Sequence, residues 1–485
     1  MSAIVTDKIK KQFLLDLFED FDSSSVSYYA GIGRSEQWDA EDNVAVPYVR
    51  ERDEREARYN MQSMKQITDR SFVIPRSNWS SGAVYSAYDD NHIGYPAQHY
   101  YVMNSNQEIY ICVQQGRDAT GQPVVSTQQP TGNTTGVPFQ TSDGYRWKFV
   151  YSIGALRASK FLSSSYMPVQ FVDSDEAASV DATAEQVEQR AVELAAKPGE
   201  VVGAEVTNAG SGYTSTPSIK VNGDGSGCEL IPVISGNSLV NILVKLDSDG
   251  NLNGTNPPSY AALDADKRSY RGHGYKRATI SITGGGGQDA SGRIILGPTG
   301  GLGADPRDDL KSGAVMFNAK VDGDEDGDFL LGDNTFRQVL LIRNPLVRDS
   351  AGRLDTHFFT DATGNTLDRM TINGINGTFV EDRIISATSG NTPFSQAYID
   401  AVDSVNATGT EARLLVHQNE TTGFTLFEGQ GSLAVEDTSN NEGTIANYIR
   451  GEVDPLTGEL LYIDNRAAVD RSAEQTEDLK IVIQL

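Results

Sequence analysis

The chain has 485 residues, and its length and composition limit what it can be. At roughly 150 residues per domain, this length predicts about three domains' worth of material. Lys+Arg 40 against Asp+Glu 66 gives a formal charge of −26, which disfavours binding to nucleic-acid phosphates and to anionic membrane surfaces. The only two cysteines, Cys112 and Cys228, cannot build a disulfide framework, so we expect synthesis in a reducing cytoplasm.

Targeting signals are not evident in the sequence. The first 21 residues carry Asp7, Lys8, Lys10 and Lys11 where a signal peptide needs an unbroken apolar stretch. No run approaches the ~18 apolar residues of a membrane helix. We therefore expect no membrane partner.

Three segments have the pattern of helices. Apolar residues at helical spacing follow a cap at Thr6 or Asp7 and continue to Phe21, which predicts an amphipathic helix that could act as a docking arm. Residues 50–58 alternate in charge and predict an exposed helix. A third helix is predicted over about 175–196. Its apolar positions are Val187, Ala191, Leu194 and Ala195, and it stops at Pro198-Gly199.

Most of the remaining chain reads as short strands separated by glycine-rich turns. This predicts a mainly β protein, with a multi-layer antiparallel β-sandwich core, a few short helices and inserted β-hairpin modules. In 145–153 the apolar side chains alternate, which predicts that Arg146 and Lys148 lie on the opposite face of the strand. Strands are predicted at 99–104, 108–113, 145–153, 314–321, 336–342, 397–402, 411–418, 424–429, 458–464 and 479–485.

One internal repeat is visible within about 199–300. Gly210-Ser-Gly-Tyr213 and Gly272-His-Gly-Tyr275 are each followed by alternating Ile or Val residues and then by a second glycine cluster. Glycine allows positive φ at a turn, so each copy is interpreted as a β-hairpin module. Coincidental turn chemistry in a glycine-rich β protein is the alternative interpretation.

A search for catalytic motifs finds none. The five histidines are dispersed, and neither a His-Glu-x-x-His pair nor a Gly-x-Ser-x-Gly turn occurs. Gly284–Gly287 runs into Gln288-Asp289, so it lacks the lysine of a phosphate-binding loop. We expect a protein that is not an enzyme, with no catalytic, cofactor-binding or metal-binding residues and no cofactor.

One acidic segment resembles a calcium loop. Asp322–Asp328 has the Asp-x-Asp-x-Asp-Gly spacing, with Asp333 at the twelfth position. Strands are predicted on both sides of it, and the usual final glutamate is replaced by an aspartate. The alternative is an acidic hairpin tip kept in solvent by its charge, and we assign no calcium site.

The three tryptophans, Trp38, Trp79 and Trp147, are the remaining candidates for ligand contacts. A functional interpretation would make them platforms for sugar rings. Their wide separation, and the alternating apolar neighbours of Trp147, favour core anchors instead.

Short motifs distributed along the chain carry a family resemblance. They are, in chain order, Ala3-Ile-Val-Thr6, Gly33-Arg-Ser-Glu-x-Trp38, Val73-Ile-Pro-Arg-x-x-Trp79, Asp143-Gly-Tyr-x-Trp147, Phe336-Arg-Gln338 with Asn344-Pro345, Gly458-Glu-x-x-Tyr462 with Asn465-Arg466, and Gln475-Thr-Glu-x-Leu-x-Ile481. In this order, the segments that hold them resemble the baseplate wedge protein encoded by gene eight of T-even-like contractile-tailed bacteriophages. The resemblance covers about residues 1–170, 301–346 and 451–485, and leaves out the two glycine-rich stretches between them.

This resemblance implies a non-enzymatic structural subunit of the virion, located in the tail baseplate and assembled in the bacterial host cytoplasm. The family's protein forms a homodimer in each wedge and contacts other wedge proteins, such as the products of genes six, seven and ten. On this basis we expect an N-terminal helical arm, a discontinuous wedge core and two inserted modules. Their ranges are 1–30 for the arm, 31–198, 301–346 and 451–485 for the core, 199–300 for the glycine-rich module with two repeats, and 347–450 for the second β module.

Two other functions remain open at this stage. The glycine-tyrosine repeats would also suit a carbohydrate-binding adhesin or a receptor-binding tail component, which would need a tyrosine-lined groove on an outward face. A polysaccharide-degrading tail enzyme would need two converging carboxylates, and such chains usually show long solenoid repeats rather than two copies.

Overall fold

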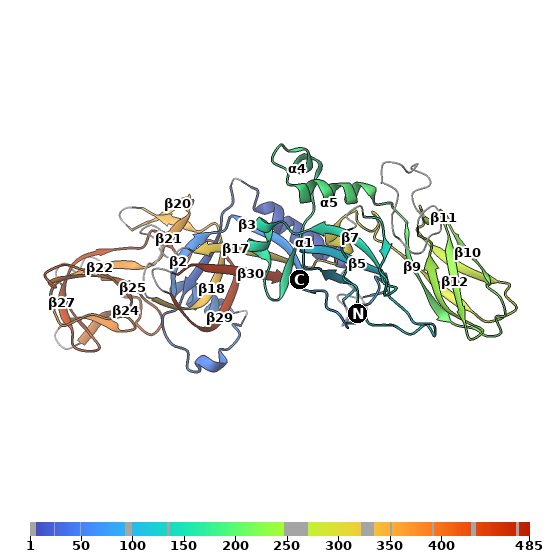
Figure 1. Cartoon of the computed structure of the whole chain (residues 1–485). Coiled ribbons are helices and arrows are strands. Elements are labelled where there is room, and N and C mark those ends of the chain that lie inside the picture. Colours follow the sequence, from blue (N-terminus) through green and yellow to red (C-terminus); the bar gives the residue numbers. More distant parts are fainter. Residues whose placement is uncertain are drawn as a thin grey trace. The chain divides into compact units, whose positions relative to one another are not determined.

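The computed structural model separates into two compact units, which we describe one at a time (Figure 1). Unit 1 comprises Met1–Lys11, Ser71–Val315 and Gln484–Leu485, and unit 2 comprises Gln12–Arg70 and Met316–Ile483. The structure describes residues 6–23, 25–48, 50–92, 99–132, 136–246, 270–321, 334–349, 352–389, 392–427, 433–471 and 475–485.

The protein is mainly β with a few short helices, as the sequence predicts. The described strands form several antiparallel sheets and also a small closed barrel, which the sequence did not indicate. The first two predicted helices are confirmed, whereas the third is interrupted at 179–183. Thr183 begins the second half with a capping box, because its Oγ1 accepts from the Gln186 amide at 3.3 Å. The helices among the described residues are α1 Asp7–Asp20, α2 Glu51–Tyr59, α3 Ala155–Phe161, α4 Ser174–Ala178, α5 Ala184–Ala195 and α6 Pro306–Asp309.

Unit 1 is built around a four-stranded antiparallel sheet in the order β4-β5-β7-β6. Its strands are β4 Tyr101–Met103, β5 Glu108–Gln114, β7 Arg146–Ser152 and β6 Phe139–Gln140. A second pair joins β3, Asp69–Pro75, to β8, Tyr166–Val169, with Phe72 opposite Val169. Aromatic side chains from β5 and β7 dominate the core of this sheet, together with Tyr85 and Val192.

Both faces of β7 are buried, which the alternation of its side chains did not predict. Trp147 is fully buried, as expected, but Arg146 and Lys148 on the opposite face are buried too. The Arg146 Nη1 atom donates to the Val244 carbonyl and the Lys148 Nζ atom to the Leu302 carbonyl, both at 2.6 Å. Chain segments more than ninety residues away in sequence cover this face, so alternation within β7 could not reveal its burial.

Within residues 201–296, the described parts 201–246 and 270–296 form four two-stranded antiparallel sheets in unit 1, which we call the glycine-rich module. The pairs are β9–β16, β10–β15, β11–β14 and β12–β13. Their bounds are β9 Val201–Asn208, β10 Ser218–Gly223, β11 Ser226–Cys228, β12 Leu230–Ser235, β13 Ser238–Val244, β14 Arg271–His273, β15 Ala278–Thr283 and β16 Ser291–Leu296.

The two repeats of this module do not form separate hairpins, so that interpretation is wrong. The strand of the first repeat pairs with the strand of the second, with Ile219 opposite Ile282 and Val221 opposite Ile280. This register places all four side chains against the module's core. Each buried tyrosine also packs on the glycines of the other copy. A Cβ at Gly287 would lie 2.5 Å from the Tyr213 ring, and one at Gly225 the same distance from the Tyr275 ring.

Unit 2 contains a five-stranded antiparallel sheet in the order β21-β2-β1-β18-β29. Its strands are β21 Thr363–Asn365, β2 Met61–Gln66, β1 Tyr28–Gly33, β18 Asn334–Arg343 and β29 Glu459–Arg471. Beside it lie the pair β17–β30 and the small sheet β20-β19-β28. These strands are β17 Ala314–Val321, β30 Glu477–Gln484, β20 Leu354–Phe358, β19 Leu346–Arg348 and β28 Val453–Asp454.

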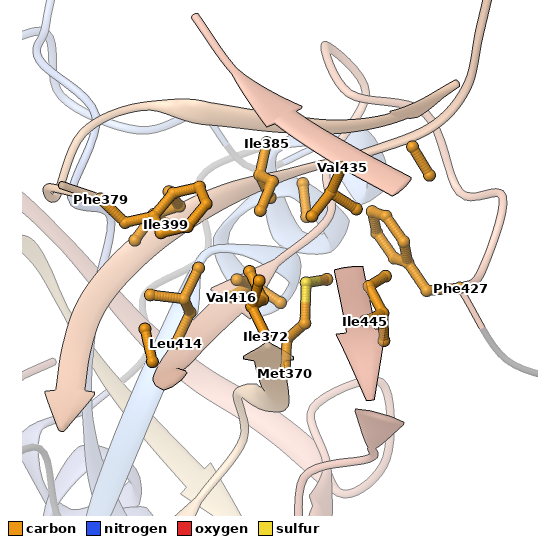
Figure 2. Packing of buried hydrophobic residues seen from close by; sticks show 13 residues of the cluster. Met370, Ile372, Phe379, Ile385, Ile399, Leu414, Val416, Phe427, Val435 and Ile445 are labelled. Carbon is orange, nitrogen blue, oxygen red and sulfur yellow. The ribbon is translucent and has the colours of Figure 1, made fainter. Parts of the chain in front are cut away.

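The six-stranded barrel in unit 2 has the order β22-β25-β24-β23-β26-β27. Its strands are β22 Asp368–Asn376, β23 Ile384–Ser389, β24 Thr392–Val405, β25 Glu411–His417, β26 Ala434–Asp437 and β27 Glu442–Ile449. Figure 2 shows the aliphatic side chains of these strands pointing toward one another, with Phe379 and Phe427 among them. The predicted strand at 424–429 is absent from its described part, 424–427, which is a loop that supplies Phe427 to this core.

Candidate functional site

The first motif of unit 2, Gly33-Arg-Ser-Glu-x-Trp38, forms a tight bend at the end of β1. A side chain at Gly33 would collide with the Asn60 carbonyl, and Arg34 adopts a positive φ of 62°. The Arg34 guanidinium lies over the Trp38 ring, 3.7 Å from its centroid. The bend therefore turns the next two side chains, Ser35 and Glu36, away from β1.

Glu36 reaches His417 at the end of the barrel strand β25. The Glu36 Oε1 atom lies 3.0 Å from the His417 Nε2 atom, and Asp400 Oδ2 of β24 lies 2.6 Å from Nδ1. All three side chains are largely or completely removed from solvent. We call Glu36, Asp400 and His417 the buried charge cluster.

The electrostatics of this cluster favour a charged histidine. Burial by itself lowers the pKa of His417, but the charges of Asp400 and Glu36 outweigh it and raise that pKa to about 10. Burial also raises the pKa of Glu36, whereas the attraction of His417 lowers it, and the net shift is downward. At neutral pH the cluster therefore holds an imidazolium between carboxylates.

Neutral polar groups donate further hydrogen bonds to the carboxylates, and Glu36 Oε2 alone among their oxygens is buried without a partner in the described residues. The Asp400 Oδ1 atom accepts from Ser35 Oγ and from Gln62 Nε2, both at 3.0 Å. The Asn419 Nδ2 atom donates to Glu36 Oε1 at 2.5 Å. The charges are thus paired and hydrogen-bonded, as buried charges need to be.

The geometry of the cluster does not suit catalysis by the histidine. Both imidazole nitrogens contact carboxylates, and the nearby hydroxyl of Ser35 points to Asp400 instead of to His417. A general base needs a free nitrogen within reach of a substrate proton. A metal would need ligand atoms converging on one point, and no such group of three occurs among the described residues. The arrangement instead fixes the barrel to the bend after β1.

Two other motif segments of unit 2, Phe336-Arg-Gln338 and Asn465-Arg466, meet at the same bend. Arg337, from Phe336-Arg-Gln338, donates to the Ser35 carbonyl and to Glu41 Oε1, the latter at 2.6 Å. The Trp38 indole donates to the Arg466 carbonyl at 2.8 Å. Gln338 Nε2 donates to Asn465 Oδ1, also at 2.8 Å. Segments more than four hundred residues apart in sequence therefore form one network.

A comparable network joins two motifs within unit 1. The Trp79 indole donates to Ser126 Oγ at 3.1 Å, and that hydroxyl donates to Asp143 Oδ2 at 3.0 Å. Asp143 also accepts from the amides of residues 127 and 128, and two residues further on Tyr145 stacks on Trp147. Burial raises the pKa of Asp143, but the hydrogen bonds to its carboxylate lower that pKa by more. The net shift is downward, so the group stays ionised.

A polar cleft of about 610 Å³ also lies within unit 1, between β5, the loop around Thr120 and the strands β9 and β13. Its volume is within the ~300–1,000 Å³ typical of small-molecule sites. Two carboxylates at its edge, Asp89 and Glu205, are bound by Arg293 at 2.7 and 3.2 Å. Apolar lining comes from Val113, Ala204, Leu239 and Ile295, and polar lining from Gln114, Gln115, Thr120, Gln122, Thr207 and Asn241.

Among the candidates taken from sequence, Trp147 is a core anchor, and Trp38 and Trp79 are half-buried in the two networks. Gly284–Gly287 packs around Tyr213. The acidic segment Asp322–Asp328, with Asp333, lies outside the described residues. Sequence reasoning missed the buried charge cluster, because His417 and Asp400 belong to a stretch without a recognisable motif.

None of the described helices is long and apolar enough to cross a membrane. A scan of the sequence against protein-family models found no match, and a search of curated protein sequences found none either.

Proposed function

We propose that this protein is a structural subunit of the baseplate wedge of a contractile phage tail, where it forms a homodimer and links neighbouring wedge proteins, including the products of genes six, seven and ten. Its mechanism is mechanical: rigid β cores hold surfaces at set angles, and assembly uses large interfaces instead of a reactive pocket. Obligate interfaces of this kind often bury ~2,000 Å² or more.

One observation carries the proposal. Several of the motifs that resemble the wedge family join into one network in each unit, at bends and buried anchors. Residues at bends and buried anchors determine the path of the chain. Two proteins with the same fold would therefore retain such residues in common. The proposal also accounts for the charge cluster as a fastening for the barrel, which lies outside the resemblance.

The test is an image reconstruction of intact tails that locates this chain. We expect its density in the baseplate, around the central hub, as dimers. Density at a fibre tip, or absence from the tail, would overturn the proposal. Light scattering at micromolar concentration gives an independent check, with an expected mass of twice 52.5 kDa; a strictly monomeric mass would contradict the dimer.

The polar cleft in unit 1 favours a second candidate function, binding of a short oligosaccharide as in an adhesin. Side-chain amides and hydroxyls both donate and accept, like sugar hydroxyls, while the apolar lining suits the C–H faces of sugar rings. A glycan array followed by calorimetric titration tests this candidate. Ala209→Trp at the cleft should abolish binding, whereas Ala407→Trp, in an exposed barrel turn, should not; an array without any signal would exclude it.

A further inference from the structure

Helix α5 in unit 1 presents its apolar side to solvent. Leu194 is 70% exposed and Val187 is 52% exposed, and Ala184 and Ala191 on the same side are exposed as well. These four residues follow one another at separations of three, four and three, which is the a and d spacing of a coiled-coil seam. We call them the α5 seam. A surface helix normally turns such a stripe toward its own core.

The opposite side of α5 explains why the helix does not rotate to bury its seam. Gln189 and Glu193 are buried there together with Val192. The Gln189 Nε2 atom donates to the Gln170 carbonyl at 2.7 Å and to Glu193 Oε1 at 2.8 Å. Glu193 also accepts from the Val172 amide at 3.2 Å. Rotation would strip these buried polar groups of their partners, which is unfavourable.

The shape of the seam fits a second helix. From Ala184 to Leu194 it extends about 15 Å at 1.5 Å per residue. Alanines alternate along it with Val187 and Leu194, so large side chains of a partner helix have room opposite the alanines and pack beside the larger residues. A strip of this length buries too little area to hold a complex alone, so it suits one contact within a larger assembly.

Charge beside the seam indicates the kind of partner. Glu188 flanks the seam, and it forms no ion pair with another described residue. The adjacent cation, Arg190, is engaged by Glu193 at 3.2 Å. A second copy of α5 packed antiparallel would bring Glu188 against its own equivalent, which is unfavourable. A helix with Lys or Arg beside its apolar stripe would be attracted.

We propose that the α5 seam is a docking strip for a basic amphipathic helix of a neighbouring protein. This inference deepens the proposed function. Only the description of the neighbour as an assembly partner rests on that proposed function. The docking chemistry itself follows from the exposure, spacing and charge of α5 and is testable with the isolated full-length chain.

The probe is a synthetic helical peptide of three heptads, with Leu at a and d and Lys at e and g, whose binding is followed by fluorescence anisotropy. We expect saturable binding that Val187→Ser with Leu194→Ser weakens about tenfold or more, equivalent to about 1.4 kcal/mol. Both changes are neutral in charge, so general attraction to the acidic chain is unaltered. Leu156→Ser on α3 is the matched control, since Leu156 is 80% exposed away from α5.

Several results would overturn the docking strip. Binding that survives the double substitution, or no saturable binding, would show that the seam does not dock a helix. Equal affinity for a peptide with Glu in place of Lys would refute a basic partner. Self-association of the chain that the double substitution abolishes would identify a second copy as the occupant. If the image reconstruction does not find the chain in the baseplate but the chain still binds the peptide, only the proposed function is refuted.

Discussion

The barrel and the glycine-rich module are attached to their own units by different chemistry. The barrel is held in unit 2 by the buried charge cluster, in which His417 bridges two carboxylates. The module is held in unit 1 by ion pairs of Arg293 with Asp89 and Asp90, at 2.7 and 2.5 Å, and by a hydrogen bond of Arg146 to a backbone carbonyl. The imidazolium of His417 can lose its proton at alkaline pH, whereas Arg293 keeps its charge, because burial lowers the pKa of Arg293 by less than its aspartate partners raise it. The two attachments should therefore respond differently to pH.

Their cores differ in a related way. The barrel closes on itself, which removes sheet edges. It buries thirteen residues in one cluster. The module consists of two-stranded sheets, and most of its apolar side chains are only partly buried. The barrel can thus fold around its own core while relying on a few charges for its position. The module depends more on the sheet beside it.

The largest expected effect is in the buried charge cluster. His417→Ala leaves Asp400 and Glu36 buried without their cation, and should lower the free energy of unfolding by roughly 4–5 kcal/mol. Denaturant titration of the full chain measures this. His357→Ala is the control, since its side chain is 80% exposed beside Asp355 and should change little. Equal effects of the two substitutions would refute the role of the cluster.

The next effect concerns the apolar core of unit 1. Trp147→Ala removes a fully buried ring that stacks on Tyr145, and should cost roughly 3–4 kcal/mol through lost burial and the cavity left behind. Thermal unfolding followed by calorimetry measures it. The loss of stability caused by Trp147→Ala should be the same at pH 7 and pH 9.5. The loss caused by His417→Ala should instead be smaller at pH 9.5. An unchanged melting temperature would show that the residue is exposed.

Alkaline pH should weaken the barrel attachment specifically. The pKa of His417 is raised from an ordinary 6.5 to about 10, so its stabilising effect is complete below about pH 6.5 and is lost as pH rises through about 10. Glu36, Asp400, Asp382, Arg34 and Tyr398 surround it. We expect a loss of about 2–3 kcal/mol between pH 7 and pH 10, measured as the difference between wild type and His417→Ala. A pH-independent difference would contradict the imidazolium.

The smallest effect is expected at Lys148. Burial lowers the pKa of this amine and raises that of Asp309 nearby, so the pair contributes little as an ion pair. Lys148→Met retains the volume without the burial cost of the amine, and should change the unfolding free energy by less than about 1.5 kcal/mol. Lys148→Ala, which leaves a cavity, should cost more. Equal losses in the two variants would show that the lysine's charge is required.

The amino-acid sequence by itself determined the class of the fold and many of its elements. Runs of apolar residues in 108–113 and 314–321 and helical spacing after Asp7 reflect local constraints, and the corresponding strands and helix are present. The positive φ values at Gly210 and Gly272 also follow from local turn chemistry. The wedge resemblance and the homodimer remain predictions.

Tertiary structure decided which strands pair, which faces are covered and which charges meet. Ile219 faces Ile282 because two distant strands share a register, and Arg146 is buried because Val244 lies over it. Asp400 and His417 acquire their role only when Glu36 reaches them from the bend after β1. Local spacing specifies how a segment can fold, whereas long-range packing selects the partner, since that choice depends on surfaces that no single segment contains.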